Sequence, residues 1–142
     1  MKGFKVAMET DTLGNTNFRK VLYTSKHSQL VLMCLQPKEE IGEEIHHDND
    51  QFFRFESGCG KCIIDGNEYM VEDGDAVIVP AGARHNIINT DAEKLLKMFT
   101  IYSPAHHKDG IIRKTKAEAE VKGNEEEFDG KTTEKFKNEI VL

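Results

Sequence analysis

Two short segments of the chain hold side chains that can bind a metal ion. Glu44 and His46 stand two residues apart, and His85 lies in a separate segment much later in the sequence. Carboxylate and imidazole groups are common ligands of first-row transition metals. Because strand side chains alternate between two faces, a strand here would direct Glu44 and His46 to one face and leave Ile45 and His47 on the other. Whether such groups meet depends on the elements that carry them.

His85 lies in the most informative stretch of the sequence. Gly74 permits a turn into one short apolar strand, and the proline and glycine of residues 80–82 shape a tight turn into the next. His85 opens that second strand. Side-chain alternation then predicts that His85, Ile87 and Asn89 share one face.

The rest of the chain up to residue 102 has the same character. Short segments rich in β-branched and aromatic residues are separated by turns rich in glycine and aspartate. Eight or more such strands, with no convincing long helix before residue 114, predict an all-β sandwich or jelly-roll barrel. We find no phosphate-binding loop, dinucleotide fingerprint or helical zinc motif, which excludes the common nucleotide folds.

Composition narrows the function classes. The 142 residues fit one domain, and 25 acidic against 19 basic side chains give a net charge of -6. Such a charge disfavours nucleic acid and anionic membranes as partners. Because no segment is apolar enough to cross a bilayer and the first residues lack a signal-peptide pattern, we expect a cytoplasmic protein.

The cysteines do not indicate a disulfide framework, because their number, three, is odd. Cys59 and Cys62 have the spacing of a redox or zinc pair, but no second pair accompanies them. We expect inert thiols, with a redox-sensitive surface bridge as the alternative.

The stretch around His85 resembles the second motif of the cupin family at every fixed position: Gly74, Pro80, Gly82, His85 and Asn89. The resemblance extends over nearly the whole chain. Small bacterial cupins labelled mannose-6-phosphate isomerase-like are similar in their single histidine and in the run Asp50-Gln51-Phe52.

The first cupin motif is met with two departures. Placing Gly58 at the motif's glycine puts Gln51 at its glutamate, His46 at its second histidine and Glu44 at its first histidine. The resemblance therefore implies a double-stranded β-helix barrel that binds one divalent metal through Glu44, His46, Gln51 and His85.

These ligands suit Fe, Mn, Ni, Co or Zn without selecting among them. If Gln51 only forms hydrogen bonds nearby, Glu44, His46 and His85 make a two-histidine, one-carboxylate site that favours Fe(II) and oxygen chemistry. We expect a small-molecule ligand at the barrel mouth beside Phe53, Ile87 and Asn89.

Two classes of function stay open. One is a metal-dependent enzyme, such as a sugar (phosphate) isomerase or an Fe-dependent dioxygenase, and the other is a non-catalytic module that binds a small ligand or a metal. A phosphomannose isomerase ranks below an unspecified metal-dependent activity, because the expected interior offers no Lys or Arg clamp, that is, no basic side chain to bind phosphate. Arg54 should point outward, and Arg84 has the opposite parity to His85.

The chain divides into a barrel at residues 1–105 and a charged extension at 106–142. A short helix is predicted after Thr115, since Glu118 completes a possible capping box. We expect His106 and His107 to form a solvated surface pair, with proton transfer at the barrel mouth as the alternative. The resemblance and the open strand edges predict a homodimer, and the extension could reach the partner.

Overall fold

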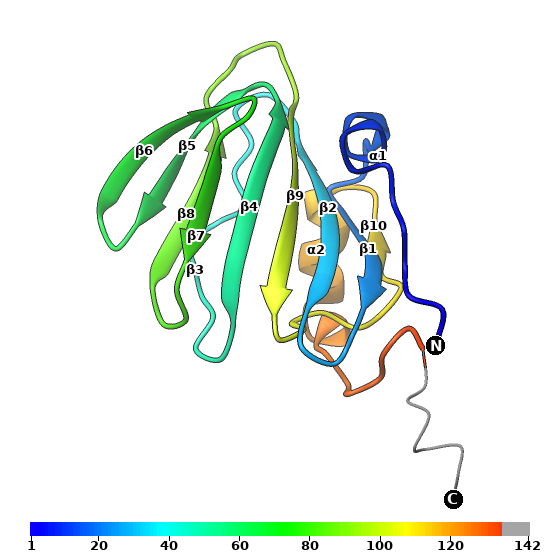
Figure 1. Cartoon of the computed structure of the whole chain (residues 1–142). Coiled ribbons are helices and arrows are strands. Elements are labelled where there is room, and N and C mark those ends of the chain that lie inside the picture. Colours follow the sequence, from blue (N-terminus) through cyan, green and yellow to red (C-terminus); the bar gives the residue numbers. More distant parts are fainter. Residues whose placement is uncertain (135–142) are drawn as a thin grey trace, which may run out of the picture.

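A computed structural model describes residues 1–134 of the chain. Two antiparallel sheets face each other, which confirms the all-β prediction (Figure 1). The six-stranded sheet has the order β10 (Ile112–Arg113), β1 (Arg19–Thr24), β2 (Gln29–Leu35), β9 (Leu96–Ser103), β4 (Asp50–Ser57) and β7 (Ala76–Val79). The four-stranded sheet has the order β3 (Glu44–Ile45), β8 (Arg84–Asn89), β5 (Cys59–Ile64) and β6 (Asn67–Glu72).

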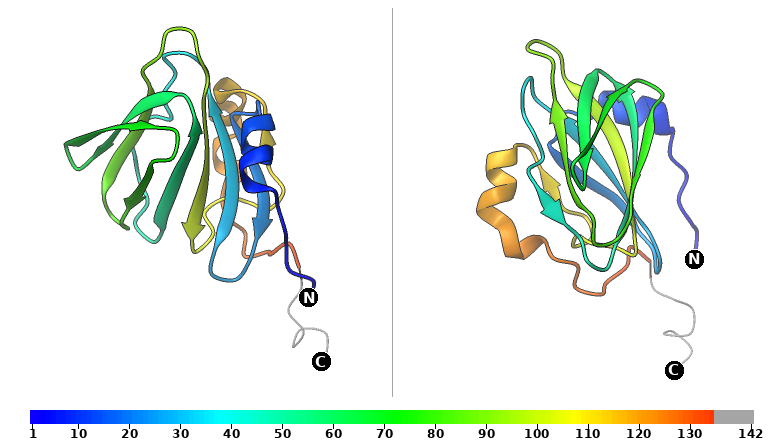
Figure 2. Two further views of the ribbon diagram at one scale, coloured as in Figure 1. Left: turned by 45° about the horizontal axis from the view of Figure 1, so that its top comes forward. Right: turned by 90° about the vertical axis from the view of Figure 1, so that its left-hand side faces the viewer.

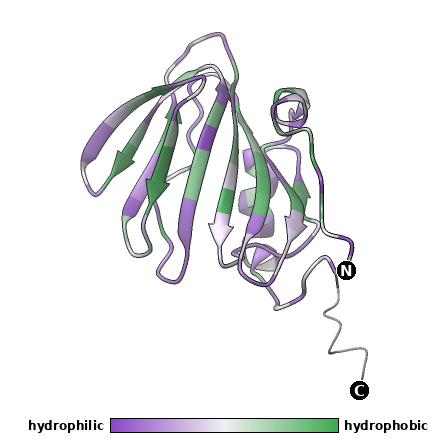
Figure 3. Cartoon of the chain, viewed as in Figure 1, coloured by the Kyte–Doolittle hydropathy of each residue, from purple (hydrophilic) through white to green (hydrophobic). Residues whose placement is uncertain are grey.

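The hydrophobic core fills the space between the sheets. Strand β4 shows how the sequence builds it, because burial alternates along the strand and the odd-numbered Gln51, Phe53 and Phe55 are all buried. Hydrophobic segments lie on strands of both sheets (Figure 3). Phe52 points to the other face, as the alternation predicts. Each fully buried aromatic or aliphatic side chain contributes about 1.5–3 kcal/mol. Other core residues come from both sheets, among them Val31, Met33, Leu35, Cys62, Val79, Ile87, Leu96 and Met98.

One glycine allows the turn between β4 and β5 to lie against the segment that leads into β9. Gly58 has a φ of +92°, and a Cβ atom at this position would lie 2.4 Å from the carbonyl oxygen of Leu95. Any side chain here would collide with that backbone, so the glycine of the first motif has a packing reason.

A short helix before the first strand was not predicted. Helix α1 (Met8–Gly14) packs on β9 and β4. Its Thr12 is buried and donates a hydrogen bond to the carbonyl of Met8. At seven residues, this helix depends on packing for its stability, so the local sequence carries little signal for it.

The extension continues the barrel as far as the structure describes it. Strand β10 pairs with β1 at the edge of the six-stranded sheet, and α2 (Lys116–Lys122) and the 3₁₀ helix η1 (Gly123–Glu126) follow. Thr115 caps α2 by accepting a hydrogen bond from the backbone N–H of Glu118, as predicted. Helices α1 and α2 lie on opposite sides of the molecule (Figure 2, right).

Residues 106–134 of the extension therefore pack on the chain's own barrel. Glu126 is buried against Arg19 and Arg113, and the Thr133 N–H donates to the carbonyl of Thr24. Residues 135–142, the last part of the predicted extension, lie outside the described residues. Within residues 1–134, every helix is too short or too polar to span a bilayer.

Candidate metal centre

Strand pairing brings two of the predicted ligands together. Strands β3 and β8 run antiparallel, and Glu44 is the direct cross-strand partner of His85. Directly paired residues of neighbouring strands point to the same face with their Cβ atoms about 5 Å apart. Two residues that are far apart in the sequence therefore become neighbours through register alone.

His46 follows β3 and is fixed by the turn before β8. The backbone N–H of Gly82 donates to the carbonyl of His46 over 2.9 Å, and Gly82 itself has a φ of +89°. A positive φ favours glycine, so the second motif's turn also positions the histidine of the first motif.

The three side chains converge on one point. One donor atom from each of Glu44, His46 and His85 lies within 4.8 Å of the others. His46 Nε2 is 2.9 Å from Glu44 Oε2, yet this buried nitrogen forms no hydrogen bond with any residue among 1–134. Two donors bound at right angles to one ion, each about 2.1 Å from it, lie about 3 Å apart. The short separation without hydrogen-bond geometry fits two ligands that share a metal ion.

His85 is held in the form that binds a metal. Its Nδ1 lies 3.1 Å from the carbonyl oxygen of Ala83, which directs Nε2 away from the backbone. Burial lowers the pKa of His85 below its ordinary value, although the Ala83 carbonyl acts in the opposite direction. A neutral imidazole whose second nitrogen is hydrogen-bonded is the common state of a ligand histidine.

Glu44 stays ionised despite its partly buried position. Burial raises the pKa of this carboxyl, but the contact with His46 and the charge of Arg19 outweigh burial and hold the pKa below its usual value. A carboxylate is the ligand form, and its charge offsets part of the charge of a dication.

Gln51 lies on the opposite sheet, beside Tyr102 across the pairing of β4 and β9. Its Nε2 donates to Thr100 Oγ1 over 3.0 Å, while its buried Oε1 has no hydrogen-bond partner in the described part of the chain. A buried acceptor without a partner is costly, so this oxygen has a reason to bind a cation. Ligation by Gln51 stays a prediction.

The three predicted substrate contacts have packing roles in the structure. Phe53 and Ile87 are buried in the hydrophobic core. Asn89 is fully buried, and its Nδ2 lies within hydrogen-bonding distance of the carbonyls of Leu35, Gln36 and Lys94. The substrate role of these residues stays a prediction, but the side-chain amide of Asn89 is already engaged.

The expectation for the histidine pair was wrong. His107 is only 6% exposed, and its Nε2 lies 3.2 Å from the Tyr102 hydroxyl. The ring of His106 lies 4.1 Å from that of His46, centroid to centroid, and stacks on Tyr102. By contrast, His47 is exposed, as the strand parity predicts.

Burial has electrostatic consequences for this pair. It lowers the pKa of His106 to about 4, and the neighbouring charge of His46 adds to the effect. Burial also lowers the pKa of His107 well below its ordinary value, with Arg19 adding to the shift. Both rings are therefore neutral near pH 7.

Gln29 explains why the pair lies inward, and no sequence pattern indicated this role. Its Oε1 accepts from the backbone N–H groups of His106 and His107, and its Nε2 donates to the carbonyl of His107 over 2.6 Å. Gln29 is 1% exposed. One buried amide on β2 thus fixes the chain where it leaves β9.

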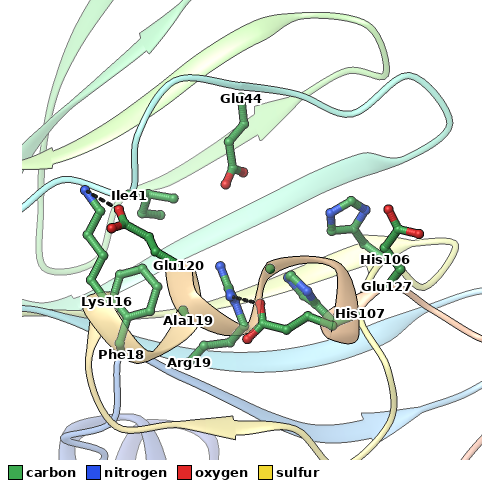
Figure 4. A pocket seen from close by; sticks show the side chains of 12 residues that line it. Phe18, Arg19, Ile41, Glu44, His106, His107, Lys116, Ala119, Glu120 and Glu127 are labelled. Carbon is green, nitrogen blue, oxygen red and sulfur yellow. Dashed lines mark hydrogen bonds and ion pairs between the residues drawn. The ribbon is translucent and has the colours of Figure 1, made fainter.

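A cavity of about 280 Å³ is lined by Glu44, one of the three donor residues, and by His106, whose ring contacts that of His46 (Figure 4). Glu44 points into it from β3, while Arg19 points up from β1 on the opposite wall. The extension supplies a further wall that includes His106 and Lys116. A volume of this size suits a small metabolite.

The cysteines of the predicted redox pair are free. Cys62 is buried in the core, and burial raises the pKa of its thiol to about 11. Cys59 is half-buried on the same strand. The raised pKa fits the prediction of an inert thiol at Cys62.

Comparison with protein families shows which family the central part of the chain matches. The cupin domain matches residues 31–102. An uncharacterized protein of Acanthamoeba polyphaga mimivirus is 44% identical over 112 residues, which cover 77% of this chain and 70% of that protein. The uncharacterized protein YrkC of Bacillus subtilis (strain 168) is 41% identical over 124 residues, which cover 83% of this chain and 66% of YrkC. The matched part thus spans about two thirds of the length of these two relatives.

Solved structures of other proteins have the same fold as this chain. A crystal structure from Bacillus halodurans is 38% identical with a TM-score of 0.82, covering 84% of this chain and 95% of that one. The cupin domain of Schizosaccharomyces pombe Cnp3 has the same fold at 14% identity, with a TM-score of 0.58 over 61% of this chain and 64% of its own.

Proposed function

The chain belongs to the cupin family, and from this premise we propose that it is a metal-dependent protein that acts on a small molecule at its barrel mouth. The observation that carries the proposal is the convergence of donor atoms from Glu44, His46 and His85 within 4.8 Å of one another, beside a cavity. The donor set, two imidazoles and one carboxylate, suits a first-row dication such as Fe, Mn, Ni, Co or Zn.

We propose Gln51 as a fourth donor. Its Oε1 is buried without a hydrogen-bond partner among residues 1–134, and Thr100 fixes the orientation of the amide. With Glu44 as the one charged ligand, the site holds a dication with a net positive charge. Such a centre favours an anionic or strongly polar ligand.

The chain's own residues account for binding and orientation at this site. When bound, the dication supplies Lewis-acid polarisation of the substrate and, as Fe(II), redox chemistry with dioxygen. His106, neutral and half-buried on the ring of His46, borders the cavity and can donate or accept one hydrogen bond to a ligand. The rings of Tyr102 and His107 are buried and lie against the ring of His106.

Among enzyme classes, an Fe-dependent dioxygenase-like activity is favoured over a sugar (phosphate) isomerase. With Gln51 as a fourth donor beside two histidines and one carboxylate, a six-coordinate Fe(II) ion would still have open positions for a substrate and dioxygen. The walls of the cavity carry four carboxylates, of Glu44, Glu120, Glu126 and Glu127, against two cations, Arg19 and Lys116, and this balance disfavours a phosphate dianion.

Elemental analysis of the purified protein tests the metal site. We expect about one transition metal per chain in the wild type and loss of at least about 90% of it in His46→Ala and in His85→Ala, because each variant removes a ligand. His47→Ala is the matched control, since the neighbouring imidazole is exposed. A metal-free wild type, or full retention in both ligand variants, would overturn the assignment.

Oxygen uptake then tests catalysis. Protein loaded with Fe(II) and supplied with a panel of small organic acids and sugars should consume oxygen, and the His85→Ala variant should not. If the protein shows no activity on the panel with any of the five candidate metals, it is instead a non-catalytic module that binds a small ligand.

We also propose that a second copy of this chain is a partner, as a homodimer. Apolar side chains gather on the outer face of the six-stranded sheet, where Ile78 is 67% exposed and pairs with Phe52, whose ring lies 6.2 Å from that of Phe99. Phe52 and Phe99 are half-buried, and an apolar patch that reaches the surface in this way is typical of an interface. Sedimentation of the wild type should give a dimer and Ile78→Glu a monomer, whereas Ile112→Glu, at an exposed site on β10, should stay dimeric. A monomeric wild type would contradict the proposal.

A further inference from the structure

A buried arginine lines the cavity, although the sequence predicted no Lys or Arg side chain in the barrel interior. Arg19 is the first residue of β1 and pairs with Met33, a core residue, so its side chain points between the sheets. It is only 6% exposed and lines the cavity opposite Glu44 (Figure 4). Buried arginines are uncommon unless a negative partner accompanies them.

The partner of Arg19 is shared with a second arginine. Arg19 Nη1 lies 2.6 Å from Glu126 Oε2, and Arg113 Nε lies 2.7 Å from Glu126 Oε1. The side chains of all three residues are at most 15% exposed. One carboxylate therefore stands between two guanidinium groups, and the cluster keeps one positive charge in excess.

Arg19 also retains unused donor capacity. Its buried Nε forms no hydrogen bond with any residue of the described chain, while Nη1 is taken by Glu126. A guanidinium group presents five donors in a planar fork. A buried charge that is incompletely paired is costly, so an anion that joins this cluster is strongly favoured.

We propose that Arg19 binds the carboxylate of a small organic monoanion in this cavity, with the rest of the ligand directed to the metal centre at Glu44, His46 and His85. This inference rests on the proposed function and names the ligand class of the same site. It also corrects the expectation that the barrel interior offers no Lys or Arg clamp.

The charge and size of the site favour a monocarboxylate. The planar guanidinium fork matches a carboxylate, and the single excess charge matches a monoanion. A phosphate dianion would carry two negative charges into a cavity whose lining holds four carboxylates against the two cations Arg19 and Lys116. The volume of about 280 Å³ restricts the ligand to a small molecule.

Calorimetric titration of the full chain tests the inference. The probes are glycolate, lactate and pyruvate, with glycolamide as a neutral analogue of glycolate and inorganic phosphate as the competing anion. Each is added up to about 10 mM to metal-free protein and to Zn²⁺-loaded protein. We expect at least one monocarboxylate to bind about tenfold more tightly than glycolamide and about tenfold more tightly than phosphate. Glycolamide lacks the negative charge that strengthens the hydrogen bonds to Arg19, and phosphate carries more negative charge than the site can neutralise.

Variants locate the contact. Arg19→Met should weaken carboxylate binding about tenfold or more, and Arg19→Lys, which keeps the charge but not the fork, should weaken it severalfold. Arg54→Met is the matched control, because this arginine has a side chain that is 41% exposed, pairs with Glu56 and does not line the cavity, so its loss should change binding less than about threefold. Arg113→Met should also weaken carboxylate binding, because it removes the excess positive charge of the cluster. Thermal unfolding of each variant shows that the fold is retained.

Several results would overturn the inference. They are binding of no monocarboxylate in either state, glycolamide binding as tightly as glycolate, tighter binding of phosphate, or unchanged binding in both Arg19 variants. Failure of the metal centre gives a different pattern. A protein that binds no metal, yet binds a carboxylate through Arg19 in its metal-free state, would refute the proposed function and leave this inference standing.

Discussion

The two walls of the cavity are built in different ways. The wall that carries Glu44, the strand partner of His85, consists of paired strands, and its geometry follows from register and one tight turn. The opposite wall, with Arg19, His106 and Glu126, depends on buried polar contacts between segments far apart in the chain. Strand pairing can thus place metal donors from local sequence patterns, whereas a charged wall needs tertiary partners.

The largest effect should come from the opposite wall. Glu126→Gln removes the one anion between Arg19 and Arg113 and leaves two buried cations, so we expect a loss of about 3 kcal/mol in the free energy of unfolding. Urea denaturation followed by circular dichroism measures it. Metal content should not change, because the ligands lie on the other wall.

Glu120→Gln is the matched control for this prediction. Glu120 is exposed and lies 3.9 Å from Lys116, a surface pair worth less than about 0.5 kcal/mol. Equal stability of the two variants would contradict the view that the opposite wall depends on its buried ion pairs.

Asn89 tests whether a motif residue on the strand wall serves packing or ligand binding. Asn89→Ala removes hydrogen bonds to three backbone carbonyls, so we expect a loss of about 2 kcal/mol in unfolding free energy. Carboxylate binding by the folded variant should equal that of the wild type in calorimetry. A variant of normal stability that binds the ligand more weakly would restore the predicted substrate role.

Acid should weaken the opposite wall. Burial holds the pKa of His106 at about 4, against 6.5 for an ordinary histidine, so the unfolded chain takes up its proton first as the pH falls. Between these values the unfolded state binds more protons, and the free energy of unfolding of metal-free protein decreases with falling pH. Allowing for the partial exposure of His106, we expect this group to contribute about 1–2 kcal/mol to the loss.

Urea denaturation at a series of pH values measures this dependence. The depressed pKa values of His107 and His85 act in the same direction, and the lowered pKa of Glu44 extends the loss to more acidic pH. His106→Gln should flatten the profile, and His47→Gln, at an exposed position, should leave it unchanged. A profile that is flat from pH 6.5 to 4 in the wild type would contradict the burial of these rings.

The smallest effect should come from Gln51, which tests whether the six-stranded sheet contributes to the metal site. Gln51→Glu adds a second carboxylate to the ligand set, so we expect the dication to bind about tenfold more tightly in competition with a fluorescent chelator. The metal-free variant should be less stable, because the new charge is buried. Unchanged affinity would show that Gln51 lies beyond the reach of the metal.

Local sequence was sufficient for much of the fold. The alternation in β4 predicted that Phe53 and Phe55 point inward, and the Thr115 and Glu118 pair predicted the start of α2. Such patterns are readable because the period of a strand and the cap of a helix depend on neighbouring residues. Helix α1 was not predicted, because its seven residues gain their stability from contacts with β9 and β4.

The metal centre and the opposite wall of the cavity also differ in how far the sequence predicts them. The sequence by itself determined the strand-turn-strand pattern and the parity that put Glu44 and His46 on one face, with the cupin resemblance naming His85 as their companion. Only the tertiary structure decided that Arg19 is buried, because parity on a strand does not show which face is covered. The burial of His106 and His107 likewise depended on one amide, Gln29, far away in the chain. Long-range hydrogen bonds and ion pairs of this kind leave no periodic trace in a sequence, since neither partner alone reveals the other.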